Sequence, residues 1–208
     1  MKILEQLIKY NDFVETTALE NAKSIPYLVL GLLSEVAELP RTMTVSKDVE
    51  KFTKELGDCF WYTVMLGRKT NFDYVYLTSA LTTLEVFDES KKRINVTKET
   101  KEEVLMNLFS QYFVTIDNLS VESGNIASVV KKVMRDKDSK FEDKDMQNIK
   151  GIITTIMNLL FSLHMCANLI FDVFELKGST LESVLNGNIK KLTTRKKENK
   201  LTGSGDNR

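Results

Sequence analysis

Two pairs of carboxylates carry the clearest chemistry in this sequence. Glu35 and Glu38 form a Glu-x-x-Glu pair, and Glu55 and Asp58 form a Glu-x-x-Asp pair after sixteen intervening residues. A three-residue spacing puts both members of a pair on one face of a helix. Both pairs lie in strongly apolar stretches, so we expect all four acids to point inward.

Carboxylates inside a helical bundle repel one another and lose hydration unless a cation neutralises them. Oxygen ligands suit a hard cation, and Mg²⁺ is the usual choice where the substrate carries phosphates. The pattern therefore predicts a magnesium site, at which Mn²⁺ can substitute, formed by Glu35, Glu38, Glu55 and Asp58. One of these carboxylates, either Glu35 or Glu38, would orient or deprotonate an attacking water.

The composition indicates a globular protein. The chain has 208 residues, 42% of them hydrophobic, which is enough to bury a sizeable core. Lysine and arginine total 29, as do aspartate and glutamate, so no basic excess predicts nucleic-acid binding. Cys59 and Cys166 lie in apolar segments typical of buried thiols in a reducing cytosol. The first residues lack a secretory pattern, and we expect a cytoplasmic protein. The apolar run 152–174 contains polar residues and favours a core helix over a membrane span.

The periodicity of hydrophobic residues predicts an all-α fold, a helical bundle. Most of the chain repeats at 3.6 residues, and there are only two prolines. Pro26 suits the first turn of a helix capped by Ser24. We expect about eight helices, at 2–22, 26–39, 46–68, 72–91, 98–117, 119–136, 144–176 and 180–196.

A weak internal repeat indicates two units in the chain. Residues 32–39 align with residues 119–126, and Asn125 stands where the first copy has its second Glu. This repeat predicts two tandem four-helix units that form a pseudo-dimer, followed by a flexible polar tail. The expected boundaries are 1–95, 96–196 and 197–208. The same offset places Glu142 and Asp145 opposite Glu55 and Asp58, but their polar surroundings favour a solvated helix start.

The stretches 27–39 and 54–62 resemble the two signature helices of the MazG-like all-α nucleoside triphosphate pyrophosphohydrolases. In that family a Glu-x-x-Glu helix precedes a Glu-x-x-Asp helix. Residues 122–136 are similar to the family's glutamate helix running into a basic segment. Residues 188–192 are similar to the closing helix of phage and bacterial members. The resemblance is best over the first 70 residues, and the second half lacks the acidic signature.

The resemblance implies a Mg²⁺-dependent enzyme that hydrolyses (deoxy)nucleoside triphosphates to the monophosphate and pyrophosphate, and so cleans or remodels the nucleotide pool. Lys131, Lys132 and Arg135 would clamp the phosphates, because lysine supplies a point charge and arginine a bidentate fork. The first repeat would then contribute the carboxylates and the second the basic residues. A homodimer or higher homo-oligomer is a possible assembly.

Several assignments stay open at this point. The base could stack on Trp61, Tyr62 or Phe13, although Trp61 and Tyr62 are also typical of core aromatics. A sugar or base contact could come from Asn188 or Asn125, and further phosphate contacts from Lys54 or Lys191. His164 lies in the most apolar segment, so we expect it to be a core residue and not part of the site.

Three functions compete. Besides a general nucleoside triphosphate pyrophosphatase, a specific enzyme of the dimeric dUTPase or dCTPase type would use the same helical carboxylates. A catalytically inactive nucleotide-binding or interaction module would explain the loss of acids in the second repeat, but retention of Glu35, Glu38, Glu55 and Asp58 argues against it. We expect neither a nucleic-acid nor a membrane partner.

Overall fold

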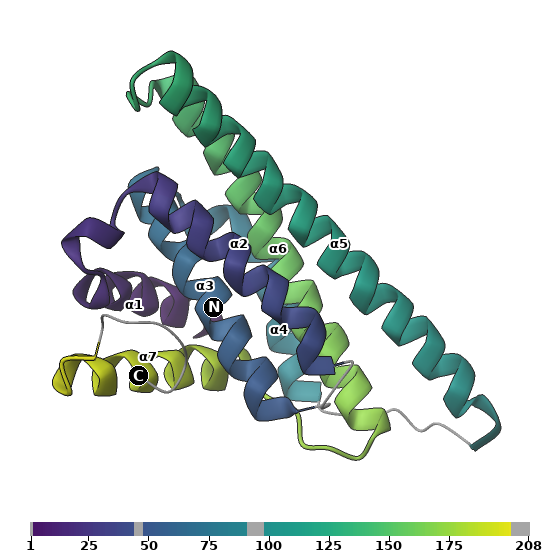
Figure 1. Ribbon diagram of the computed structural model, residues 1–208. Helices are drawn as coiled ribbons and strands as arrows, with labels where there is room; N and C mark the ends of the chain where they lie inside the picture. The colour runs from purple at the N-terminus through teal and green to yellow at the C-terminus, as the bar shows by residue number, and fades with distance from the viewer. Residues whose placement is uncertain (1, 44–47, 91–97, 201–208) are drawn as a thin grey trace.

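The computed structural model describes residues 2–43, 48–90 and 98–200, and these ranges contain helices and no strand. The fold is an all-α helical bundle, as predicted (Figure 1). Its α-helices are α1 (Lys2–Thr17), α2 (Ile25–Arg41), α3 (Val49–Lys69), α4 (Thr78–Ser90), α5 (Lys98–Asp136), α6 (Asp143–Val173) and α7 (Leu181–Lys197). Two short 3-10 helices, η1 (Glu20–Ala22) and η3 (Tyr74–Leu77), precede α2 and α4.

Capping residues explain where several helices begin. The Ser24 hydroxyl accepts a hydrogen bond from the Tyr27 amide, and Pro26 occupies the first turn of α2, so this predicted start is confirmed. Asp48 caps α3 and Thr180 caps α7 in the same way. These caps satisfy amide groups that have no acceptor within the helix.

The break predicted at residue 118 is wrong, because α5 is one helix of 39 residues. No proline lies in this segment, and Gly124 is its only glycine, so nothing in it stops a helix. Packing on two neighbours sustains the length, since α5 lies against both α2 and α6. The predicted helix 2–22 is also shorter, because α1 ends at Thr17 and η1 follows.

The long helices α5 and α6 form a hairpin along one side of the molecule, and one end of this hairpin extends beyond the other helices (Figure 1). Next to the hairpin, α2 lies against α5, and α3 contacts α2, α6 and α7. On the far side, α1 packs against α7 and α3. Helix α3 is therefore central, which explains why most of its side chains are buried.

Buried side chains from all of these α-helices form one continuous core. Residues 98–200 contain three helices, so the second half does not have the four-helix form predicted for it. A division into two repeats at residue 95 stays a prediction. The expected tail overlaps the end of α7, and its residues 201–208 lie outside the described residues.

The most apolar helix belongs to this core. By length and composition α6 could cross a membrane, but 61% of its most apolar window is buried inside the protein. His164 on α6 is fully buried, and burial lowers the pKa of its imidazole to about 4. Its Nε2 lies 3.0 Å from the carbonyl oxygen of Ser179, which fits the predicted core role. Cys59 and Cys166 are buried free thiols, also as predicted.

Candidate functional site

The two carboxylate pairs meet where α2 packs against α3. Glu35 and Glu38 come from α2, and Glu55 and Asp58 from α3. Acceptor oxygens of Glu35, Glu55 and Asp58 all lie within 4.8 Å of one another. Glu55 is only 2% exposed, whereas Glu38 is exposed and stands outside this group of three. Glu35, Glu55 and Asp58 point inward as expected, whereas the expectation is wrong for Glu38, which is exposed because it lies at the outer edge of the group.

A cavity of about 320 Å³ opens onto these acids, and we call it the acid cavity. Helices α2, α3 and α7 and the segment around η1 form its walls. The charged side chains in its lining are Glu35, Glu38, Glu55, Asp58, Lys191 and Arg195. Carboxylates from two helices thus face two cations from a third across one space.

Helix α7 holds Asp58 in place through both carboxylate oxygens. The Lys191 ammonium forms an ion pair and hydrogen bond with Oδ2 of Asp58. The Asn188 amide donates to Oδ1 of Asp58 at 2.7 Å. The Tyr10 hydroxyl in turn donates to Oδ1 of Asn188 at 2.6 Å. Such a chain of buried hydrogen bonds fixes the orientation of the carboxylate.

A glycine allows α7 to come this close. A Cβ atom at Gly57 on α3 would lie 3.1 Å from the Cβ of Asn188 and 3.4 Å from the carbonyl oxygen of Val184. These contacts are tight for real side chains, so the bare backbone of α3 at Gly57 lets Asn188 reach Asp58.

The surroundings of the acids disfavour negative charge. Burial, reinforced by the negative charges of the other three acids, raises the pKa of the Glu35 carboxyl to about 8, and Lys191 partly offsets this rise. Burial and the charge of Asp58 also raise the pKa of the Tyr10 hydroxyl. Like-charged groups crowded in this way favour a bound cation.

Aromatic side chains line another part of the acid cavity. Tyr27, Trp61 and Tyr62 all border it. Trp61 is 8% exposed, and its indole Nε1 donates to the Thr17 hydroxyl at 3.1 Å. Tyr62 contacts Trp61 edge to face with ring centroids 4.9 Å apart. Trp61 is therefore both a core aromatic and a wall of the cavity.

A second glycine makes room for one of these rings. A Cβ at Gly31 on α2 would lie 2.1 Å from Cε1 of Tyr62, so a side chain there would displace the ring. The Tyr62 ring consequently lies directly on the backbone of α2.

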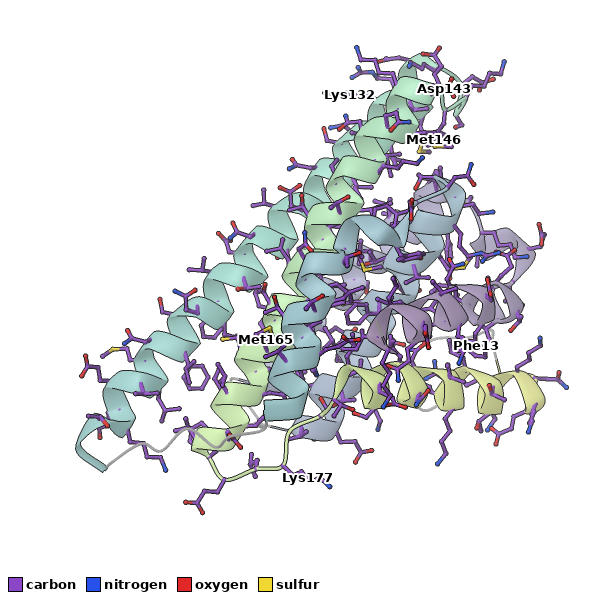
Figure 2. The ribbon with its side chains drawn as sticks, turned by 180° about the vertical axis from the view of Figure 1, so that it is seen from behind. Phe13, Lys132, Asp143, Met146, Met165 and Lys177 are labelled. Atoms are coloured by element: carbon purple, nitrogen blue, oxygen red, sulfur yellow. The ribbon has the colours of Figure 1, made fainter. Side chains whose placement is uncertain are left out.

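The basic segment expected to clamp phosphates lies elsewhere. Lys131, Lys132 and Arg135 are exposed on α5 and do not line the acid cavity. Figure 2 shows Lys132 near the end of the hairpin formed by α5 and α6, away from Phe13 on α1 and from α7 beside it. The basic residues and the acids lie apart because α2 contacts α5 and α3 through different faces. Val29 of α2 borders the groove shared with α5, whereas the acids of α2 face α3 and α7.

Other predicted substrate contacts are also redistributed. Asn188 is buried and uses its amide on Asp58 and Tyr10, so it positions an acid instead of lining the acid cavity. Phe13 packs against Tyr10, and Lys54 pairs with Glu50, both outside the lining. Asn125 is exposed on α5. Of the alternatives left open, Trp61, Tyr62 and Lys191 do border the acid cavity.

Sequence reasoning missed three side chains of the site. Arg195 lies one helical turn beyond Lys191, and this four-residue spacing of basic residues on the last helix was an available signal. Tyr10 and Tyr27 gave no comparable signal, because tyrosines at helical spacing are typical of ordinary core and surface positions.

A comparison with curated proteins finds a relative from a phage. It is 34% identical over 87 residues to the Gene 37 protein of Mycobacterium phage L5, and the match covers 42% of this chain and 68% of that protein. The chain belongs to the Gene 37 protein family. No model of a protein family matches it, and no solved structure matches it. The name of the family describes no activity, and the acid cavity is the feature of the structure that points to a function.

Proposed function

We propose that this protein is a Mg²⁺-dependent nucleoside triphosphate pyrophosphohydrolase, as the resemblance of its first 70 residues to the MazG-like enzymes implies. The observation that carries the proposal is the acid cavity itself. Three clustered carboxylates, two cations of α7 and a group of aromatic rings border one space of about 320 Å³. A nucleotide presents the complementary groups, namely phosphates, a metal-binding oxygen surface and a flat base.

The donor set fits a hard divalent cation. Glu35, Glu55 and Asp58 offer only oxygen atoms, and no histidine or cysteine stands among them. The positive charge of Lys191 against Asp58 is a further sign that the cluster accepts a cation. When bound, Mg²⁺, or Mn²⁺ in its place, supplies charge neutralisation for the phosphate oxygens and lowers the pKa of a coordinated water.

The cations of the chain would hold the phosphates. Lys191 and Arg195 replace Lys131, Lys132 and Arg135 in this role, because they border the same cavity as the acids. Lysine offers a compact charge and arginine a two-pronged contact to phosphate oxygens. Their charge stabilises the pyrophosphate as it leaves.

Glu38 is the carboxylate best suited to the attacking water. It borders the acid cavity but stands outside the group of three, so its oxygens are not committed to the metal. The water oxygen bonds to the α-phosphorus while its proton passes to Glu38, and the bond from that phosphorus to the oxygen bridging to the β-phosphate breaks. The products are a nucleoside monophosphate and pyrophosphate. The base lies against Tyr62 and the exposed edge of Trp61.

The test is release of pyrophosphate from a panel of ribo- and deoxynucleoside triphosphates, with Mg²⁺ or with a chelator. We expect Mg²⁺-dependent release that Glu38→Gln abolishes without loss of folding, because Glu38 is exposed. Glu50→Gln, on the exposed face of α3, is the matched control and keeps wild-type activity. Preference for one base would indicate the dUTPase or dCTPase type.

No release from any triphosphate by folded protein with Mg²⁺ would overturn the enzyme proposal. Nucleotide binding without release would then favour the inactive nucleotide-binding module. We retain the expectation that the protein acts in the cytoplasm on free nucleotides.

A further inference from the structure

The outer face of α5 exposes large apolar side chains. Met106 is 69% exposed and Val121 54%, and Phe113 and Val114 between them are also exposed. Helix α5 packs against α6 and α2 on its other faces, and Figure 1 shows it along one edge of the molecule. These side chains are therefore covered by none of the described helices, although burying them would be favourable.

The exposed residues follow the spacing of a helix-pairing seam. Positions alternating by three and four residues form one stripe along a helix, and paired helices contact each other along such stripes. We call this stripe the α5 seam, and it includes Met106, Ser110, Phe113, Asp117, Val121, Gly124 and Ser128. Small residues at three of these positions let a second helix come close. A Cβ at Gly124 would meet nothing within 4 Å in the isolated chain, so its surroundings are open.

The charged residues on the side of the α5 seam are separated by sign, although Lys101 precedes Glu102 in the sequence. Only Asp117 and Glu122 are charged between residues 103 and 131. Glu102 and Glu103 lie at the beginning of this stretch, and a basic group, Lys131, Lys132 and Arg135, lies at its end. The two ends are about 42 Å apart at 1.5 Å per residue. This exceeds the screening length of about 8 Å, so each end acts on its own surroundings.

We propose that a second copy of this chain covers the α5 seam, with the two α5 helices antiparallel. In that arrangement the Glu102 and Glu103 end of each copy faces the Lys131 and Lys132 end of the other. Parallel pairing would instead bring like charges together at both ends, which is unfavourable. The α5 seam is thus complementary to itself in only one direction.

The charges also set the register. Placing residue 103 opposite residue 131 puts the two-fold axis at residue 117, midway between them. Phe113 of one copy then lies opposite Val121 of the other, and small Ser110 lies opposite Gly124. At the axis, Asp117 of one copy comes near Asp117 of the other, and the repulsion between these like charges weakens the dimer. This dimer does not depend on the chemistry of the acid cavity, which α3 and α7 border on other faces of the bundle.

The experiment is light scattering after gel filtration, with sedimentation equilibrium for the dissociation constant, on the full chain. We expect a dimer at tens of micromolar. Val121→Glu, at an exposed position, gives a folded monomer. Val86→Glu, also exposed but on α4, is the matched control and leaves the dimer intact. Asp117→Asn strengthens it.

A charge exchange tests the antiparallel direction. Reversing the acidic end (Glu102→Lys with Glu103→Lys) or the basic end (Lys131→Glu with Lys132→Glu) alone weakens the dimer by about tenfold or more. Combining both pairs restores it. A monomeric wild-type chain, or a dimer that Val121→Glu leaves unchanged, would overturn the proposal. Failure of the combined variant to regain affinity would overturn the antiparallel arrangement.

Discussion

Replacing Lys191 by methionine should tighten metal binding while it weakens the metal-free fold. The Lys191 ammonium neutralises Asp58, and both side chains are mostly buried, at 17% and 15% exposed. Asp58 must give up this contact to become a metal ligand. The Lys191 ammonium therefore occupies part of the site that a metal ion would take and supplies part of its positive charge. It becomes available to phosphate when the metal binds.

The magnitude follows from the contact that the metal must break. A hydrogen bond between charged groups contributes about 1.5–3 kcal/mol net. Since about 1.4 kcal/mol corresponds to a tenfold change in affinity, Lys191→Met should bind metal about ten- to 150-fold more tightly. The same loss leaves Asp58 without its cation in the absence of metal. At about 2–4 °C per kcal/mol for a chain of this size, unfolding of the metal-free variant should begin some 3–12 °C lower.

The assay is calorimetric titration of Mn²⁺ into chelator-stripped protein, paired with thermal unfolding with and without metal. Lys190→Met, the exposed neighbour on α7, is the matched control and should change neither quantity. A Lys191 variant that binds metal no more tightly than the wild type would refute the idea that the ammonium competes with the cation. Absence of metal binding in both proteins would instead refute the metal site itself.

Three further predictions concern the same helices. Because burial raises the pKa of Glu35 to about 8 from 4.5 in the folded chain, the folded chain holds a proton that the unfolded chain releases. The stability of the metal-free protein should therefore fall as the pH rises from about 5 to 8. Thermal unfolding at several pH values measures this slope, and Glu35→Gln should flatten it. Tyr10→Phe removes the buried hydrogen bond to Asn188, and chemical denaturation should detect a loss of about 1–2 kcal/mol, which an unchanged midpoint would contradict. Gly31→Ala pushes the Tyr62 ring off α2 and should cost about 1–3 kcal/mol and alter tryptophan fluorescence, whereas wild-type values in both would show that the ring moves freely.

Local signals in the sequence predicted local features well. The cap at Ser24, the proline after it and three of the four inward acids all depend on residues within a few positions of one another. Helix termini and one-sided burial are set at this range, so spacing alone is informative. The break predicted in α5 was wrong for the same reason. A helix ends at a local stop signal, and none occurs near residue 118.

Contacts between distant segments could not be predicted in this way. Lys131 and Lys191 look alike in the sequence, since each is a basic residue on an amphipathic helix. Only packing decides that one lies on an exposed face and the other against Asp58. Residues 190–197 are at least as rich in basic residues as residues 131–137. The resemblance of residues 122–136 to the family's basic segment favoured Lys131 and its neighbours for the phosphates.

Helix α7 connects the site to the rest of the bundle. Asn188 and Lys191 bind the two oxygens of Asp58, and Tyr10 of α1 binds Asn188. The Lys196 ammonium also donates to the carbonyl oxygen of Thr16 at the end of α1. Movement of α7 away from α3 would therefore free Asp58 and withdraw Lys191 together. The position of α7 thus links the geometry of the acids to that of the cations facing them, although more than a hundred residues separate the two in the sequence.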